Sequence, residues 1–78
     1  MSRIRLGDFI TLVEKIDDDE FFGQLIEIFV CEWGGYFMRL VDDCGNDVTV
    51  HSGNVKTING VYVSNLSYDK YGLKIEVL

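Results

Sequence analysis

The sequence predicts an all-β fold, a small barrel of about five strands followed by a C-terminal β-hairpin. Period-two patterning in residues 36–41 indicates a strand, and glycine-containing pairs interrupt the apolar runs where hairpins reverse. The chain has eight glycines and no proline, which leaves every backbone N–H free to join a ladder. No apolar series at helical spacing fills three turns. The 78 residues leave room for one domain, residues 1–78, with one core.

An acidic loop separates the first two expected strands, residues 8–14 and 21–30. Like charges in series repel one another and are stable only in water, so this segment is expected to be solvated. Its four consecutive acids are Asp17, Asp18, Asp19 and Glu20.

The second of these strands is apolar on both faces. Ile26, Ile28 and Val30 mark one face, and Leu25 and Phe29 mark the other. Such a strand must be covered twice, by the barrel interior on one side and by something else on the other. We expect the second cover to be the C-terminal segment or another chain.

Residues 36–58 are expected to form a strand, a tight turn, a strand, a short turn of helix and a strand. Gly45-Asn46 supplies the first reversal, and Ser52-Gly53-Asn54 interrupts the pattern again. The alternation places one set of side chains on the inward face. These are Tyr36, Met38, Leu40, Val48 and Val50, followed by Val55 and Ile58.

The C-terminal part begins with a strong hairpin signal, Asn59-Gly60, because a type I′ turn needs positive φ at both central residues. Residues 61–63 should pair back on residues 56–58. Residues 64–67 are expected to be looser, a further turn is expected at residues 69–72, and a last strand at residues 73–78.

This order of elements resembles the Src-homology-3-like barrel. Residues 47–58 look like the segment in which that family passes through a 3₁₀ turn into its last strand. Residues 7–12 followed by residues 22–28 are similar to the KOW motif, in which a glycine opens the second strand. The resemblance covers about residues 7–58 and implies a small barrel with the C-terminal hairpin as an addition.

The chain departs from both families at positions that matter for binding. Where peptide-binding Src-homology-3 domains carry a proline and a tyrosine near the 3₁₀ turn, this chain has His51 and Asn54, which argues against polyproline recognition. KOW modules usually carry basic loops that meet phosphates. This chain has 13 acidic and 7 basic residues, for a net charge of −6, whereas a phosphate-binding surface needs a positive charge.

In barrels of this kind the acidic loop and the loop of residues 31–35 flank one cleft. The resemblance therefore implies that Asp17, Asp18, Asp19 and Glu20 lie near Trp33, with Tyr36 alongside. An arginine of a partner can pair with the acids and stack on the indole ring. The alternative is that the acids form a solvated loop and Trp33 folds back on the core.

A second acidic group, Asp42, Asp43 and Asp47, surrounds the expected turn at Gly45-Asn46. Together the two groups suggest a surface that imitates a nucleic-acid backbone and competes for the basic groove of an enzyme. In size and composition the chain is similar to small acidic inhibitors encoded by phages and mobile elements. Acidity also serves solubility, which is the plainer interpretation.

Neither a metal site nor a catalytic centre is expected, and no cofactor. Cys31 and Cys44 lack the spacing of a zinc or redox pair and are expected to be reduced, and His51 has no second histidine to share a metal. The acidic loop lacks the spacing of a calcium loop, and no nucleophile is paired with a base. No segment approaches the roughly 20 apolar residues of a membrane span, so we expect a cytoplasmic protein.

These features favour a non-enzymatic interaction module that presents an acidic face to a basic surface of a partner protein. A KOW-like accessory module that contacts RNA or DNA is the alternative. It requires one face to gather six cations, which are Arg3, Arg5, Arg39, Lys56, Lys70 and Lys74. A third interpretation is a structural subunit, in which Leu25 and Phe29 or the last strand pairs with another copy.

Overall fold

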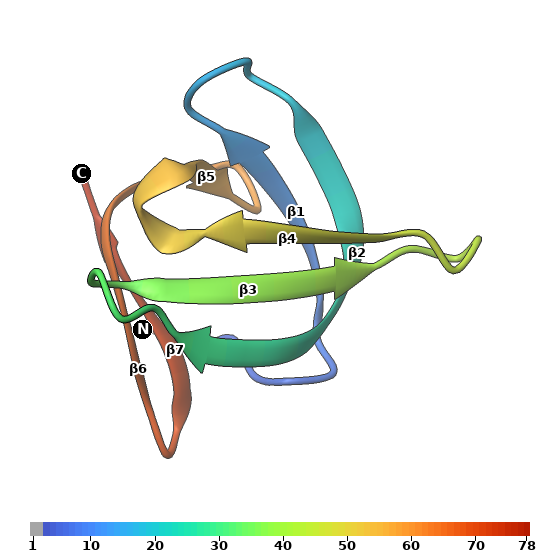
Figure 1. The fold of residues 1–78 in the computed structure, drawn as a ribbon. Coiled ribbons are helices and arrows are strands. Elements are labelled where there is room, and N and C mark those ends of the chain that lie inside the picture. Colours follow the sequence, from blue (N-terminus) through green and yellow to red (C-terminus); the bar gives the residue numbers. More distant parts are fainter. Residues whose placement is uncertain (1–2) are drawn as a thin grey trace.

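Seven antiparallel strands form one sheet in the computed structural model, which describes residues 3–78 (Figure 1). The strand order is β4-β3-β2-β1-β5-β6-β7, so β1 is the middle strand and β4 and β7 are the edges. One 3₁₀ turn, η1, joins β4 to β5. The elements are β1 Phe9–Glu14, β2 Glu20–Val30, β3 Tyr36–Val41, β4 Asp47–His51, η1 Ser52–Asn54, β5 Val55–Ile58, β6 Val61–Asp69 and β7 Gly72–Val77.

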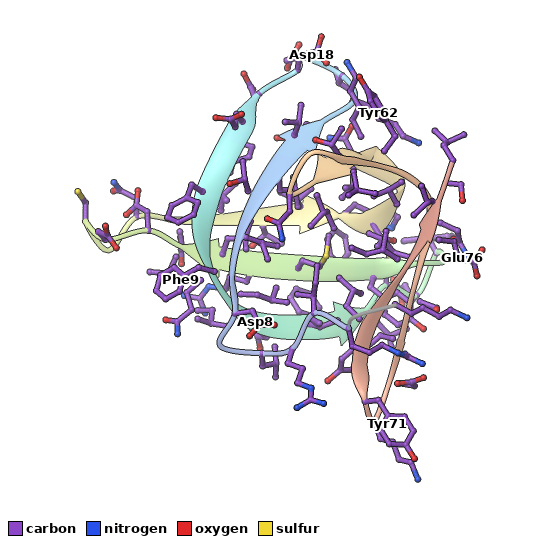
Figure 2. All side chains as sticks on the ribbon, turned by 180° about the vertical axis from the view of Figure 1, so that it is seen from behind. Asp8, Phe9, Asp18, Tyr62, Tyr71 and Glu76 are labelled. Atoms are coloured by element: carbon purple, nitrogen blue, oxygen red, sulfur yellow. The ribbon has the colours of Figure 1, made fainter. Side chains whose placement is uncertain are left out.

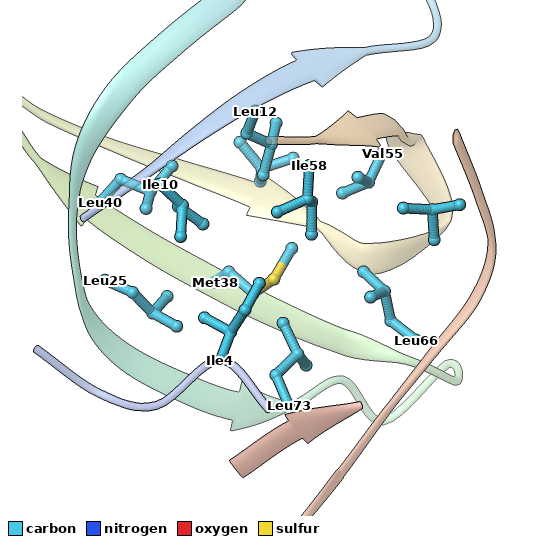
Figure 3. Close-up of a cluster of buried hydrophobic side chains, with 12 residues drawn as sticks. Ile4, Ile10, Leu12, Leu25, Met38, Leu40, Val55, Ile58, Leu66 and Leu73 are labelled. Atoms are coloured by element: carbon cyan, nitrogen blue, oxygen red, sulfur yellow. The ribbon is translucent and has the colours of Figure 1, made fainter. Parts of the chain in front are cut away.

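The sheet curves around one hydrophobic core, to which every strand contributes a side chain (Figure 3). All core side chains are at most 7% exposed. The inward faces predicted for β3, β4 and β5 are confirmed at Met38, Leu40, Val50, Val55 and Ile58. The complete core is Ile4, Ile10, Leu12, Leu25, Met38, Leu40, Val50, Val55, Ile58, Val63, Leu66 and Leu73.

The all-β class is confirmed, but the seven strands form one open sheet rather than a closed barrel, and the five-strand barrel with an added hairpin stays a prediction. Within residues 3–78 no ladder joins the two edge strands. The outer edge of β7 pairs instead with the N-terminal segment, through one bridge between Ile4 and Leu73. The Ile4 N–H donates to the Leu73 carbonyl at 3.0 Å, and the Leu73 N–H donates to the Ile4 carbonyl at 2.6 Å. The same segment then reaches β2, where the Gly7 N–H donates to the Leu25 carbonyl at 2.7 Å.

A β-bulge divides β2 into two parts. Leu25 is paired with Leu40, but the next pair is Glu27 with Arg39, which leaves Ile26 as the extra residue. A bulge bends its strand and increases the local twist. In Figure 1, β2 accordingly changes direction along its length, from its start beside β1 to its end beside β3.

The bulge also changes which side chains of β2 face the core. Leu25 is fully buried and Ile28 packs against the core, whereas Phe29 is 42% exposed. The predicted grouping of Leu25 with Phe29 on one face is therefore wrong, and a buried Leu25 cannot pair with another copy. Phe29 instead stacks on Phe37 across the outer face, with ring centroids 5.4 Å apart.

The predicted turns are confirmed, and β6 is longer than predicted. Asn59 and Gly60 have φ values of 52° and 81°, as a type I′ turn requires. Residues 64–67, expected to be loose, lie inside β6, because this strand stays paired with β7 from Val63 to Asp69.

Candidate functional site

The acidic loop, residues 15–19, joins β1 to β2 and is exposed throughout. The Glu14 N–H donates to the Asp19 carbonyl at 2.9 Å and closes the loop. Asp18 adopts a left-handed conformation with φ of 54°, which aspartate tolerates better than most residues. Its Oδ1 lies 2.7 Å from the Lys56 Nζ. This hydrogen bond, with the attraction of the Asp18 charge, raises the pKa of Lys56.

Trp33 lies in the loop between β2 and β3, and its side chain is 90% exposed. The interpretation in which Trp33 folds back on the core is therefore wrong. The loop is closed by a hydrogen bond from the Cys31 N–H to the Gly35 carbonyl at 3.0 Å. Tyr36 follows the loop, and its ring forms a T-shaped contact with the Tyr68 ring, with the two ring centroids 6.2 Å apart.

His51 and Ser52 attach the Trp33 loop to the rest of the fold. The Tyr36 N–H donates to the Ser52 Oγ at 3.0 Å. The His51 Nδ1 accepts from the Gly53 N–H at 2.9 Å, so its Nε2 is the nitrogen that donates to the Gly34 carbonyl at 2.8 Å. The one histidine therefore has a structural role as the N-cap of η1.

The two parts of the predicted site lie at opposite ends of β2 (Figure 1). No hydrogen bond, ion pair or ring contact within residues 3–78 joins Trp33 to Asp17, Asp18, Asp19 or Glu20. The 3₁₀ turn η1 connects the two regions, because its other end accepts the Lys15 N–H at the Asn54 carbonyl, at 2.8 Å. A cleft shared by Trp33 and the acidic loop stays a prediction.

Glu20 lines one pocket together with Asp42 and Asp47, two of the acids around the β3–β4 turn. A pocket of about 290 Å³ opens where the start of β2 extends past its first pair with β3. We call it the acidic pocket. Its wall combines carboxylates with apolar side chains that no local sequence pattern groups together. The lining residues are Glu20, Phe21, Phe22, Leu40, Asp42, Asn46, Asp47 and Val48.

Two carboxylates of the acidic pocket are held in place by hydrogen bonds. The Asp42 Oδ1 accepts the Cys44 N–H at 2.9 Å and the Asn46 N–H at 3.0 Å. Desolvation acts to raise the pKa of Asp42, but the hydrogen bonds from Asn46 and Cys44 outweigh it and the pKa is lowered. The Asp47 Oδ2 accepts from Arg39, whose Nη2 lies 2.6 Å away. The hydrogen bond to Asp47 raises the pKa of Arg39.

The lowered pKa of Asp42 predicts a loss of stability in acid. A group whose pKa is depressed on folding stabilises the protein above its unfolded pKa, about 3.9, and loses this effect as pH falls through the folded value. The free energy of unfolding should therefore fall less between about pH 5 and pH 2 in Asp42→Asn than in the unsubstituted protein. Urea denaturation at each pH measures this difference. Asp43→Asn is the control, since no hydrogen bond within residues 3–78 reaches that carboxylate. An equal fall in both variants would contradict this prediction.

The six cations required by the nucleic-acid alternative do not gather as one group. Lys56 is paired with Asp18, which Figure 2 shows at the opposite end of the molecule from Tyr71 of the β6–β7 hairpin, and Arg39 is paired with Asp47. The other four belong to the N-terminal segment and to the β6–β7 hairpin with which it pairs; they are Arg3, Arg5, Lys70 and Lys74. The requirement that all six lie together is therefore not met, and what remains of the alternative concerns this hairpin.

Both cysteines are free, and Cys44 is exposed in the β3–β4 turn. Within residues 3–78 no group of three or more histidine, cysteine, aspartate or glutamate side chains is arranged to hold a metal ion. The same residues include no helix with the length and apolar character needed to cross a membrane.

Comparisons with protein-family models, curated proteins and solved structures found no match for this chain. The Src-homology-3-like and KOW-like resemblance stays a prediction. The function of this chain is therefore inferred from its own geometry.

Proposed function

We propose that the chain is a non-enzymatic interaction module whose acidic pocket binds an arginine or lysine side chain on the basic surface of a partner protein. One observation supports this proposal above the others. Glu20, Asp42 and Asp47 border a pocket that also contains the apolar side chains of Leu40 and Val48.

That combination matches the chemistry of a long cationic side chain. The methylene stem of arginine or lysine packs on apolar surface while its charged head stays among acceptors. Arginine fits better, because its planar guanidinium can bind a carboxylate through two hydrogen bonds. Phe21 and Phe22 add apolar surface beside the stem. Asp42, with its lowered pKa, keeps its charge at neutral pH.

The remaining acids extend the negative surface around this pocket. Asp17, Asp18 and Asp19 immediately precede Glu20, and Asp43 follows Asp42 in the chain. Such a field steers a basic partner from a distance and raises its association rate. A partner that uses its basic groove for nucleic acid would be inhibited by occupation of that groove. The chain would then act as an inhibitor of nucleic-acid binding by that partner.

The test measures the affinity for a fluorescein-labelled arginine-rich peptide by anisotropy. The double variant Glu20→Gln/Asp42→Asn should weaken binding about tenfold or more, since a hydrogen bond to a charged group contributes about 1.5–3 kcal/mol. The matched control, Glu32→Gln/Glu76→Gln, removes the same charge at exposed positions outside the pocket. It should change the affinity by less than about threefold, because exposed, screened charges contribute little.

Equal weakening in both double variants would show that only net charge matters and would remove the pocket from the proposal. Circular dichroism and urea unfolding confirm that both variants are folded. A partner that is captured from cell extract by the unsubstituted protein, and is lost with Glu20→Gln/Asp42→Asn, can then be assayed for inhibition of its nucleic-acid binding.

A further inference from the structure

A second groove, of about 460 Å³, lies between the N-terminal segment and the β6–β7 hairpin. We call it the basic-tyrosine groove. Its chemistry is the opposite of that of the acidic pocket, because cations and tyrosine rings line it and no acid does. The lining residues are Arg5, Leu6, Tyr68, Lys70, Tyr71 and Gly72.

Backbone contacts fix the two sides of this groove against each other. The reciprocal hydrogen bonds between Ile4 and Leu73 hold the N-terminal segment on β7. Gly72, with φ of 112°, allows this close approach, since a Cβ there would lie 2.6 Å from the Ile4 carbonyl oxygen. The Arg5 N–H donates to the Asp8 Oδ2 at 2.8 Å, which fixes the backbone of Arg5.

The cations of the groove are available to a ligand. Within residues 3–78 no ion pair involves Arg5 or Lys70. Two acids near the groove are already engaged. The Asp8 Oδ2 accepts the Arg5 N–H, and Asp69 accepts the Tyr71 N–H at its Oδ1, at 2.8 Å, while its Oδ2 lies 2.9 Å from the Arg3 Nη1. The hydrogen bond from Tyr71, followed by that from Arg3, outweighs desolvation and lowers the pKa of Asp69.

The tyrosines offer ring surface beside these cations. Tyr71 is 59% exposed at the hairpin turn, and the Lys70 Nζ lies 5.1 Å from the centroid of its ring. Tyr68 is 37% exposed, and its ring forms a T-shaped contact with that of Tyr36. Aromatic faces next to cations are the combination with which proteins bind single-stranded nucleic acid, because bases stack on the rings while phosphates meet the charges.

The net charge of −6 opposes such a ligand only if the acids lie close to the groove. Figure 2 shows Asp18 of the acidic loop and Tyr71 of the hairpin at opposite ends of the molecule. The principal extents are 29 × 27 × 27 Å. The screening length at physiological ionic strength is about 8 Å, so the charge of the acidic loop is largely screened at the groove.

We infer that the basic-tyrosine groove is a second binding site, for single-stranded nucleic acid. Arg5 and Lys70 hold a phosphate, and a neighbouring base stacks on Tyr71. This site is independent of the acidic pocket. It lies between the N-terminal segment and the β6–β7 hairpin, and its lining residues are outside the part of the chain that resembles the KOW motif.

The test is fluorescence anisotropy with a labelled single-stranded oligonucleotide at low and at physiological salt. Tyr71→Ala should weaken binding about 5- to 150-fold, the range for loss of one base–aromatic stack. Tyr62→Ala is the matched control: it removes a tyrosine that is 56% exposed on β6, outside the groove, and should leave the affinity within about twofold.

A second variant tests the binding of phosphate. Arg5→Gln/Lys70→Gln should make the slope of log affinity against log salt shallower by about 0.7 for each phosphate that is no longer neutralised. The control, Lys15→Gln/Lys56→Gln, removes the same charge at the acidic end and should leave the slope unchanged.

Three results would overturn the inference. They are no binding of the oligonucleotide even at low salt, equal losses for Tyr71→Ala and Tyr62→Ala, and tighter binding of an acidic peptide than of the oligonucleotide. The acidic-pocket variant Glu20→Gln/Asp42→Asn should still bind the oligonucleotide, so failure of one site is distinguishable from failure of the other.

Discussion

Leu12→Ala is expected to lower the free energy of unfolding by about 2–5 kcal/mol, the range for removing a large side chain from a packed core. Leu12 is fully buried and lies in β1, the middle strand of the sheet. Its backbone is in register with Phe21 of β2 on one side and Ile58 of β5 on the other. The strands on both sides limit collapse around the cavity, so the loss should not be small.

This loss is large relative to the whole molecule. Natural domains are stable by about 0.05–0.15 kcal/mol per residue, which is roughly 4–12 kcal/mol for a chain of this length. Equilibrium urea unfolding measures the difference. Ile16→Ala is the control, since Ile16 is 79% exposed in the acidic loop and its loss should cost less than about 0.5 kcal/mol. Similar effects of the two substitutions would mean that β1 is not central to the core.

The elements predicted correctly are those whose signal is local. Asn59-Gly60 specifies its turn through the φ values of two adjacent residues, and Met38 and Leu40 mark the inward face of β3 by simple alternation. The bulge at Ile26 has no comparable signal, because β2 is apolar on both faces and either set of side chains could face the core. The length of β6 likewise depends on its pairing with β7.

The candidate sites were less predictable than the fold, because they depend on contacts between distant segments. The acidity of residues 17–20 is visible in the sequence, but Glu20 lines one pocket with Asp42 and Asp47 because the start of β2 extends past its first pair with β3. The bend in β2 likewise decides where Trp33 lies relative to the acids. Arg5 lines the same groove as Tyr71 because Ile4 pairs with Leu73, and no local sequence pattern predicts this pairing.

Gly72→Ala is expected to lower the free energy of unfolding by about 2–6 kcal/mol, since strain at positive φ and overlap with packed backbone each cost roughly 1–3 kcal/mol. A Cβ at this position would lie 2.6 Å from the Ile4 carbonyl oxygen, which belongs to backbone and cannot rotate away. The substitution should therefore separate the N-terminal segment from β7. Urea unfolding measures the effect on stability.

Gly45→Ala separates the two causes of this loss. Gly45 also has positive φ, 80°, but a Cβ there would meet nothing within 4 Å. It should therefore cost only the backbone strain, about 1–2 kcal/mol. Equal costs for the two glycines would contradict the close packing of Ile4 on Gly72. Gly72→Ala should also weaken oligonucleotide binding, because Arg5 follows Ile4 in the chain and would move out of the basic-tyrosine groove with it. Gly45→Ala should leave oligonucleotide binding unchanged.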